Sequence, residues 1–109
     1  MLNNIFELRY LPLFYEELER SVTYIAYALK NSEAASKLLD DVESAIIKRL
    51  HDNPEAFEKV PSVKDRKHSY YRIYVRNYIV YYVVLEENGK KIMEVRRFLH
   101  ELEDRDNKI

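Results

Sequence analysis

Cationic and aromatic side chains, the residue types that commonly contact nucleic acids, are concentrated in the second half of the chain. Residues 59–109 carry 12 Lys and Arg against 8 Asp and Glu, whereas residues 1–58 carry 6 against 11. This asymmetry indicates either an anionic partner for the basic half or an unevenly charged surface. Arginine and lysine stabilise phosphate charge, and tyrosine stacks on bases. The candidates for contact with a target or a nucleic acid are Lys64, Arg66, Lys67, Tyr74, Arg76 and Arg96.

The tyrosines also have a structural interpretation. Six of the ten lie between Tyr70 and Tyr82, where tyrosine is commonly a core or strand-pair residue with its hydroxyl at the rim. We expect this role for most of them. Tyr74 is the best candidate for base stacking because it alternates with Arg72 and Arg76.

Several classes of chemistry are excluded by composition. The chain has no cysteine, so it forms no disulfide, thiolate nucleophile or cysteine-based metal site. Its three histidines lack metal-ligand spacing, and we expect no metal and no cofactor. The N-terminus lacks the basic and long apolar regions of a signal peptide, and no apolar stretch approaches the roughly 20 residues that span a bilayer. We therefore expect a cytoplasmic protein with one domain, residues 1–109.

The first half predicts a strand followed by two helices. β-Branched and aromatic residues from Ile5 to Tyr10 predict the strand. Helical spacing begins at Pro12, and Ser32 is a candidate N-cap for a second helix that ends before Asn53 and Pro54. The first apolar stripe is Phe14, Leu18, Val22, Ile25 and Leu29, with Glu16, Glu17, Glu19 and Arg20 off it; the second is Ala35, Leu38, Leu39, Val42, Ile46 and Leu50. The short break between the helices predicts an antiparallel hairpin.

The second half predicts a loop over residues 55–69 and then three strands. Residues 70–75 alternate apolar and polar side chains, and residues 78–85 are apolar on both faces, as in a central strand. Asn88 and Gly89 form a strong hairpin signal before a return strand over residues 91–98. Arg96 and Arg97 are adjacent in that strand, so one should point to each face.

These elements predict an α+β fold. The helical hairpin packs on one face of a mainly antiparallel sheet of about four strands. The first strand is expected to lie parallel beside the last.

Two stretches resemble the RelE/ParE toxin superfamily, and the likeness is closer to its ParE-like members. The stretch LERSVTYIAYALKNSEAASKLLDDVESAIIKRLHDNPEAF is similar to the ParE-type helical hairpin with its Tyr-Ile-Ala, Ala-rich helix start and Asn-Pro. The stretch YYRIYVRNYIVYYVVLEENGKKIMEVRRFLHELEDRD resembles the superfamily's Tyr-Arg-Ile-x-Val, Tyr-x-x-x-Tyr and terminal His-x-x-Arg-Asp patterns. Together the two stretches span nearly the whole chain.

The resemblance implies the toxin of a bacterial type II toxin–antitoxin system of the plasmid-stabilisation type. Its partner would be a cognate antitoxin, which typically wraps the toxin with a disordered, amphipathic and often acidic segment. ParE-like members inhibit DNA gyrase, whereas RelE-like members cleave mRNA on the ribosome without a metal. In the second case the resemblance implies Arg72, Arg97 and His100 as catalytic residues.

Two positions depart from the nuclease pattern. Ile79 follows the matched Tyr78 where nuclease members commonly have arginine, and Glu103 replaces the arginine of His-x-x-Arg-Asp. An isoleucine cannot stabilise phosphate charge, and a glutamate repels it. Gyrase inhibition is therefore slightly favoured. The alternatives are a ribosome-dependent endoribonuclease and a degenerate toxin that only binds its antitoxin.

Overall fold

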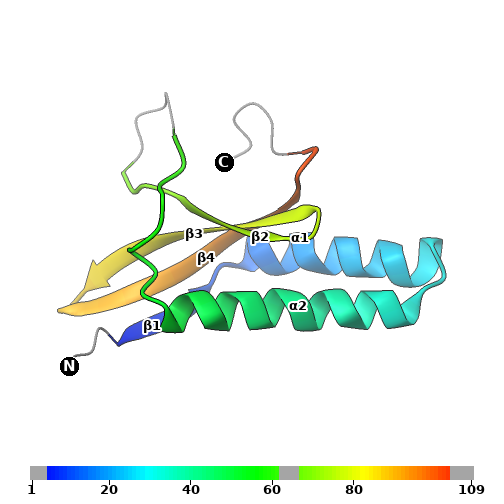
Figure 1. Ribbon diagram of the computed structural model, residues 1–109, viewed down its shortest axis with the longest axis horizontal. Coiled ribbons are helices and arrows are strands. Elements are labelled where there is room, and N and C mark those ends of the chain that lie inside the picture. The colour runs from blue at the N-terminus through cyan, green and yellow to red at the C-terminus, as the bar shows by residue number, and fades with distance from the viewer. Residues whose placement is uncertain (1–4, 62–66, 104–109) are drawn as a thin grey trace.

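Two helices cover one face of a four-stranded sheet in the computed structural model, which describes residues 5–61 and 67–103 (Figure 1). The elements in chain order are β1 (Phe6–Tyr10), α1 (Pro12–Thr23), a π-helical turn (Tyr24–Ala28), α2 (Ser32–His51), β2 (Tyr71–Val75), β3 (Tyr78–Glu87) and β4 (Lys90–His100). The strand order is β1-β4-β3-β2, with β1 parallel to β4 and the other pairs antiparallel. The α+β prediction is confirmed, including the parallel pairing of the first and last strands.

Helix α1 starts as its sequence suggests but ends differently. Pro12 occupies the first turn, where its missing N–H costs no hydrogen bond. The helix then widens into the π-helical turn, in which the Leu29 N–H donates to the Tyr24 carbonyl. Five-residue spacing inserts an extra residue into the turn. The predicted stripe is consequently wrong at Leu29, whose side chain is largely exposed.

Helix α2 is capped by Asn31, so the prediction of Ser32 as N-cap is wrong by one residue. The Asn31 Oδ1 accepts a hydrogen bond from the Ala34 N–H at 2.9 Å, and Ser32 is the first helical residue. Lys30 adopts a left-handed conformation (φ 53°), which turns the chain back and makes the hairpin antiparallel. Asn53, also left-handed, follows the end of α2 and precedes the buried Pro54.

The sheet confirms the predicted hairpin turn and the predicted central strand. Asn88 and Gly89 both have positive φ values, 53° and 77°, as a two-residue hairpin that matches strand twist requires. β3 lies between β2 and β4, which explains its apolar residues on both faces. A register shift opposite Tyr81 and Tyr82 interrupts the pairing of β3 with β4.

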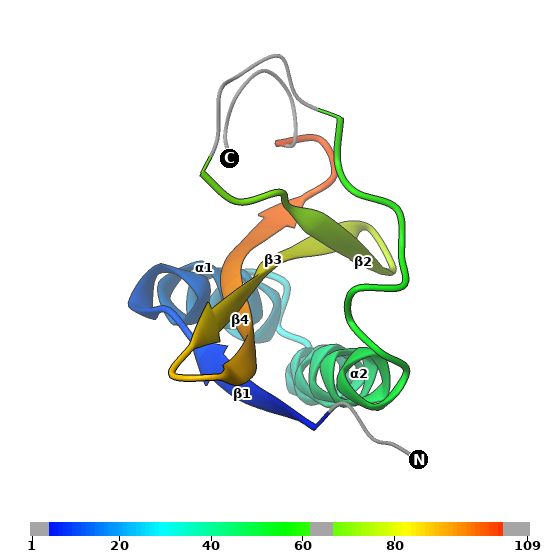
Figure 2. The same ribbon diagram turned by 90° about the vertical axis from the view of Figure 1, so that its left-hand side faces the viewer.

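The main core lies between the sheet and the two helices, which run side by side (Figure 2). Each fully buried apolar side chain in it contributes about 2 kcal/mol through the hydrophobic effect. Its buried members are Phe14, Leu38, Val42, Ile46, Tyr71, Ile73, Val75, Val80, Tyr82, Met93, Val95 and Phe98. Leu39, predicted on the buried stripe of α2, is instead 42% exposed.

A smaller cluster lies on the opposite face of the sheet. Ile79, Tyr81 and Leu99 are buried there against Val60 and Tyr70, which belong to the segment that follows α2. This segment crosses from the helical layer to the far side of the sheet (Figure 1). The Val60 N–H donates to the Tyr70 carbonyl at 2.7 Å and fastens it beside β2.

Tyr82 provides a test of how this segment is anchored. Its hydroxyl donates to the Pro54 carbonyl at 2.7 Å and accepts from Arg49 at 2.9 Å. We expect Tyr82→Phe to lower the free energy of unfolding by about 1–3 kcal/mol in urea titrations, because a buried carbonyl loses its donor. Tyr74→Phe, at an exposed hydroxyl, is the control and should change little.

The same variant should alter the response to alkaline pH. Burial raises the pKa of Tyr82, so the folded state holds this proton more tightly than the unfolded chain. The contribution of this proton to the free energy of unfolding is complete below the ordinary tyrosine pKa of about 10. It is lost as pH rises through the pKa of Tyr82 in the folded state. Tyr82→Phe should therefore lose less stability than the parent above that pH. Equal losses in the two proteins would contradict this assignment.

Candidate functional site

The two predicted catalytic arginines flank one buried tyrosine. Tyr81 of β3 pairs with Arg72 on β2 and with Arg97 on β4, so the three residues occupy one rung of the sheet. Adjacent strands are separated by about 4.8 Å, which places the two arginine backbones about 10 Å apart. Arg72 is half-buried, and its guanidinium lies 5.8 Å from the ring of the exposed Tyr74.

The guanidinium of Arg97 is turned toward α1. It donates to both carboxylate oxygens of Glu17, with Nη2 2.6 Å from Oε2 and Nε 3.0 Å from Oε1. The backbone N–H of Phe98 donates to the same carboxylate at 2.9 Å. Hydrogen bonding to Glu17 raises the pKa of Arg97, and the pair is largely buried, with side-chain exposures of 19% and 7%.

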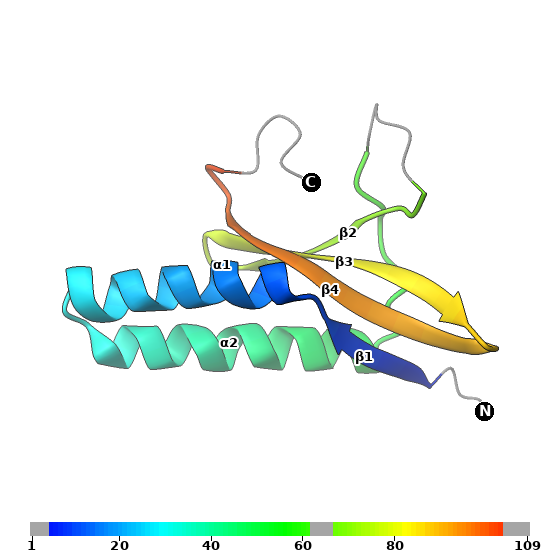
Figure 3. The same cartoon turned by 180° about the vertical axis from the view of Figure 1, so that it is seen from behind.

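Glu17 replaces β1 as the hydrogen-bond partner of β4 beyond the point where β1 ends. The last β1 partner of β4 is Val95, whose carbonyl accepts from the Leu11 N–H. Beyond that point the chain enters α1, as the rear view shows (Figure 3), and can no longer supply strand hydrogen bonds. A buried N–H without an acceptor costs free energy. The glutamate supplies that acceptor for Phe98 and neutralises Arg97 at the same time.

Two further predicted contact residues are also paired with carboxylates. Arg76 stands in the turn after β2 with φ 55°, and its guanidinium forms an ion pair with Asp41 on α2. It therefore points to the helices, away from Tyr74. Arg96 donates through Nε to Glu94 at 2.8 Å and through Nη1 to the Tyr70 hydroxyl at 3.3 Å.

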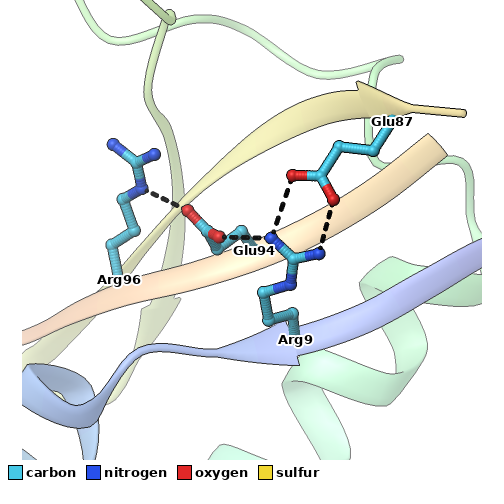
Figure 4. Close-up of polar contacts among 4 residues, drawn as sticks. All are labelled: Arg9, Glu87, Glu94 and Arg96. Atoms are coloured by element: carbon cyan, nitrogen blue, oxygen red, sulfur yellow. Dashed lines mark hydrogen bonds and ion pairs between the residues drawn. The ribbon is translucent and has the colours of Figure 1, made fainter.

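Glu94 is the centre of a charged network on the face of the sheet away from the helices (Figure 4). Its carboxylate, 6% exposed, accepts from both Arg96 and Arg9. Arg9 also forms two hydrogen bonds with Glu87 at the end of β3, and this pairing raises the pKa of Arg9 and lowers that of Glu87. Three strands are thus joined by alternating charges.

His100, at the end of β4, is held by its own turn. Its ring packs edge-on against Tyr78 at 5.2 Å, and its Nδ1 accepts from the Leu102 N–H at 3.1 Å. Its backbone N–H donates to the Glu103 carboxylate at 3.0 Å. Glu103, one of the two departures from the nuclease pattern, therefore closes this turn.

The remaining predicted positions do not join the rung. Ile79, the other departure, is buried among apolar side chains on the face shared by Tyr81. Lys67 is exposed, whereas Lys64 and Arg66 lie outside the described residues. In residues 5–61 and 67–103, no group of three or more His, Asp or Glu side chains is arranged to hold a metal ion.

The sequence did not reveal the carboxylates that form ion pairs with these arginines. Glu17 was placed off the apolar stripe of α1, but it is 7% exposed and faces β4. Glu94 stands in an apolar strand, where a single acidic residue signals a buried ion pair. No local pattern pairs Asp41 with Arg76, because the two residues are 35 positions apart.

The helices leave an open groove between them. It is lined by apolar residues of α1 and α2 and by Tyr10 at the end of β1. Burial raises the pKa of the Tyr10 hydroxyl, and the neighbouring Tyr15 and Glu43 raise it further.

The part of the chain that the structure describes includes no helix long and apolar enough to cross a membrane.

A family model described as the ParE toxin of type II toxin-antitoxin system, parDE, matches residues 8–105. The chain belongs to this family. It is therefore a toxin of a type II toxin–antitoxin system, with an antitoxin as its partner. A comparison with curated proteins found no match. The matched range runs from β1 to beyond the turn after β4 and includes every residue of the Arg72–Tyr81–Arg97 rung.

Glu17 should be critical for the stability of this ParE-family toxin. We expect Glu17→Gln to lower the free energy of unfolding by about 2–4 kcal/mol, because the largely buried Arg97 would lose the carboxylate that binds it. Glu16→Gln, one residue away and exposed, is the matched control and should change it by less than about 0.5 kcal/mol. Urea unfolding of both variants measures the difference. Equal effects would rule out a special role for Glu17.

Proposed function

We propose that the toxin acts by binding, with DNA gyrase as its target in the cytoplasm, and that the cognate antitoxin neutralises it. The observation that supports this proposal is the pairing of cations with carboxylates around the rung. Arg97 is bound to Glu17, Arg76 to Asp41 and Arg96 to Glu94.

A metal-independent nuclease needs the opposite arrangement. The phosphate gains charge in the transition state of RNA cleavage, and positioned cations stabilise it. A carboxylate already bound to a guanidinium competes with the phosphate for its N–H donors. Of the arginines named as candidates, Arg72 is the one that forms no ion pair within the described residues. Ile79 adds no charge beside it.

Arg72 and Tyr74 are suited to contact a protein surface. Tyr74 is 61% exposed, and its ring lies beside the guanidinium of Arg72. Arginine and tyrosine are enriched among the residues that dominate binding energy at interfaces. The Arg72 backbone is held in place because its carbonyl accepts from Arg49 at 3.1 Å. We propose this pair as part of the gyrase-binding surface.

Ribosome-dependent mRNA cleavage is the second candidate function. It is favoured by the placement of Arg72 and Arg97 on one rung, with His100 at the end of the same strand as Arg97. In that case Arg97 would have to exchange Glu17 for the phosphate. A toxin that retains only antitoxin binding is the third candidate.

Two assays separate these functions. Purified toxin should inhibit gyrase supercoiling, leave ribosome-bound mRNA intact and lose its effect when the cognate antitoxin is added. Cleaved mRNA with normal supercoiling would instead establish the nuclease. An inert protein in both assays, together with normal growth on induction, would leave only antitoxin binding.

The proposed surface is tested in the supercoiling assay. We expect Arg72→Ala combined with Tyr74→Ala to raise the inhibitory concentration at least about ten-fold, as loss of interface anchors does. Lys90→Ala, at an exposed cation that begins β4, is the control and should inhibit like the parent. Unchanged inhibition by a folded double variant would remove Arg72 and Tyr74 from the surface.

A further inference from the structure

The outer edge of β1 is open for strand pairing. β1 stands at one end of the sheet, so in the described part of the chain only one of its edges is bonded to another strand (Figure 2). The Leu11 N–H donates to the Val95 carbonyl of β4, and successive residues of a strand direct their backbone groups to opposite edges. Phe6, Leu8 and Tyr10 therefore present their N–H and C=O groups outward. These groups form no hydrogen bond within the described residues.

The opposite edge of the sheet is partly covered. Lys59 forms a β-bridge with Tyr71, the first residue of β2, and the Val60 N–H donates to the Tyr70 carbonyl. An uncovered strand edge readily pairs with another strand, and proteins often prevent this with charged side chains on the edge strand. The charges of β1 therefore decide whether its edge repels or accepts a second strand.

β1 and the residue on each side of it form a self-complementary sequence. Residues 5–11 read Ile-Phe-Glu-Leu-Arg-Tyr-Leu. Counted from both ends toward Leu8, an aliphatic residue matches an aliphatic one, an aromatic matches an aromatic, and an acid matches a base. Two copies of this strand that run antiparallel about Leu8 would place Glu7 of each copy opposite Arg9 of the other.

Backbone geometry and charge both select this register. Hydrogen bonds across an antiparallel pair require outward-facing residues to lie opposite one another, so Leu8 would pair with itself and Phe6 with Tyr10. A shift by two residues keeps such bonds but brings Glu7 opposite Glu7 or Arg9 opposite Arg9. Like charges directly opposite each other are destabilising. The register centred on Leu8 therefore satisfies hydrogen bonding and charge together.

Glu7 and Arg9 are both available for this contact. Glu7 is exposed and forms no ion pair within the described residues. Arg9 binds Glu87 and Glu94 through Nη1 and Nη2, while its Nε takes no part in these bonds and its side chain is 41% exposed (Figure 4). Side chains two positions apart share one face of a strand, so both charges lie on the face away from the helices.

We propose that the edge of β1 binds a second copy of the toxin by antiparallel pairing centred on Leu8, which joins two four-stranded sheets into one. The pairing also gives Ile5, which is 82% exposed, an apolar neighbour in Leu11 of the second copy. Two five-residue strands bury less area than a typical stable interface. The dissociation constant of the dimer is accordingly about 10–100 μM.

Sedimentation velocity over a concentration series tests the dimer. The full-length toxin should pass from monomer to dimer within that concentration range, and added salt should weaken the association. Glu7→Lys brings a cation opposite Arg9 at both symmetric positions and should raise the dissociation constant at least about ten-fold. Glu58→Lys makes the same charge change at an exposed position beyond α2, and should leave it unchanged. Circular dichroism verifies folding.

Introduced cysteines test the register, because the chain has none of its own. Glu7 and Arg9 of facing copies would have Cα atoms about 4.5 Å apart, which a disulfide can bridge. Glu7→Cys mixed with Arg9→Cys and oxidised with glutathione disulfide should therefore give a cross-linked dimer. Ile5→Cys mixed with Leu11→Cys should do the same and keeps the bonds of Arg9. Glu7→Cys alone should cross-link poorly, because its two copies would lie about 8 Å apart.

Three results would overturn the proposal. They are a monomer at all concentrations, equal effects of Glu7→Lys and Glu58→Lys on the dissociation constant, and cross-linking of Glu7→Cys alone as efficient as that of both mixtures. None of these measurements contains gyrase or an antitoxin. Their outcome is therefore independent of the supercoiling assay.

Discussion

The carboxylate of Glu17 is the contact on which the arrangement of helices and sheet depends. It supplies the hydrogen-bond acceptor that the edge of β4 lacks once β1 has ended, and it neutralises Arg97 in a largely dry position. An apolar residue at this position would remove the acceptor of a buried backbone donor and the carboxylate that binds a largely buried guanidinium. Because Glu17 stands on α1, the same contact fixes where the first helix lies along the sheet.

The distribution of paired and unpaired charges gives the molecule two different faces. Glu94 holds Arg9 and Arg96 on the face of the sheet away from the helices. Glu17 and Asp41 join arginines of the sheet to α1 and α2, so these cations serve mainly as structural ties. On the helical side, carboxylates border an apolar groove and have no counter-charges within the described residues. The ion pairs therefore stabilise the fold, whereas the unpaired carboxylates lie at the surface of the helical layer.

The elements of the fold could be predicted from the sequence because each has a local signal. Pro12 marks the start of α1, Asn88-Gly89 marks a hairpin, and the apolar run of β3 marks a central strand. The ion pairs could not be predicted, because their partners are distant in sequence and because the sequence does not distinguish a buried glutamate from an exposed one. The predicted burial of Leu29 and Leu39 was wrong for a related reason, because helical spacing does not reveal a π-helical turn or an open groove.

The parallel pairing of β1 with β4 has a consequence for when the toxin matures. Residues 6–10 pair with residues 91–95, and Glu17 binds Arg97. The elements that the ribosome makes first therefore lack these partners until the last strand has been made. Contacts between such distant segments form slowly, since a long loop must close before they contribute. The edge of the sheet stays incomplete until nearly the whole chain has emerged. Synthesis itself thus imposes a delay before toxicity, and a partner already present in the cell can use that interval.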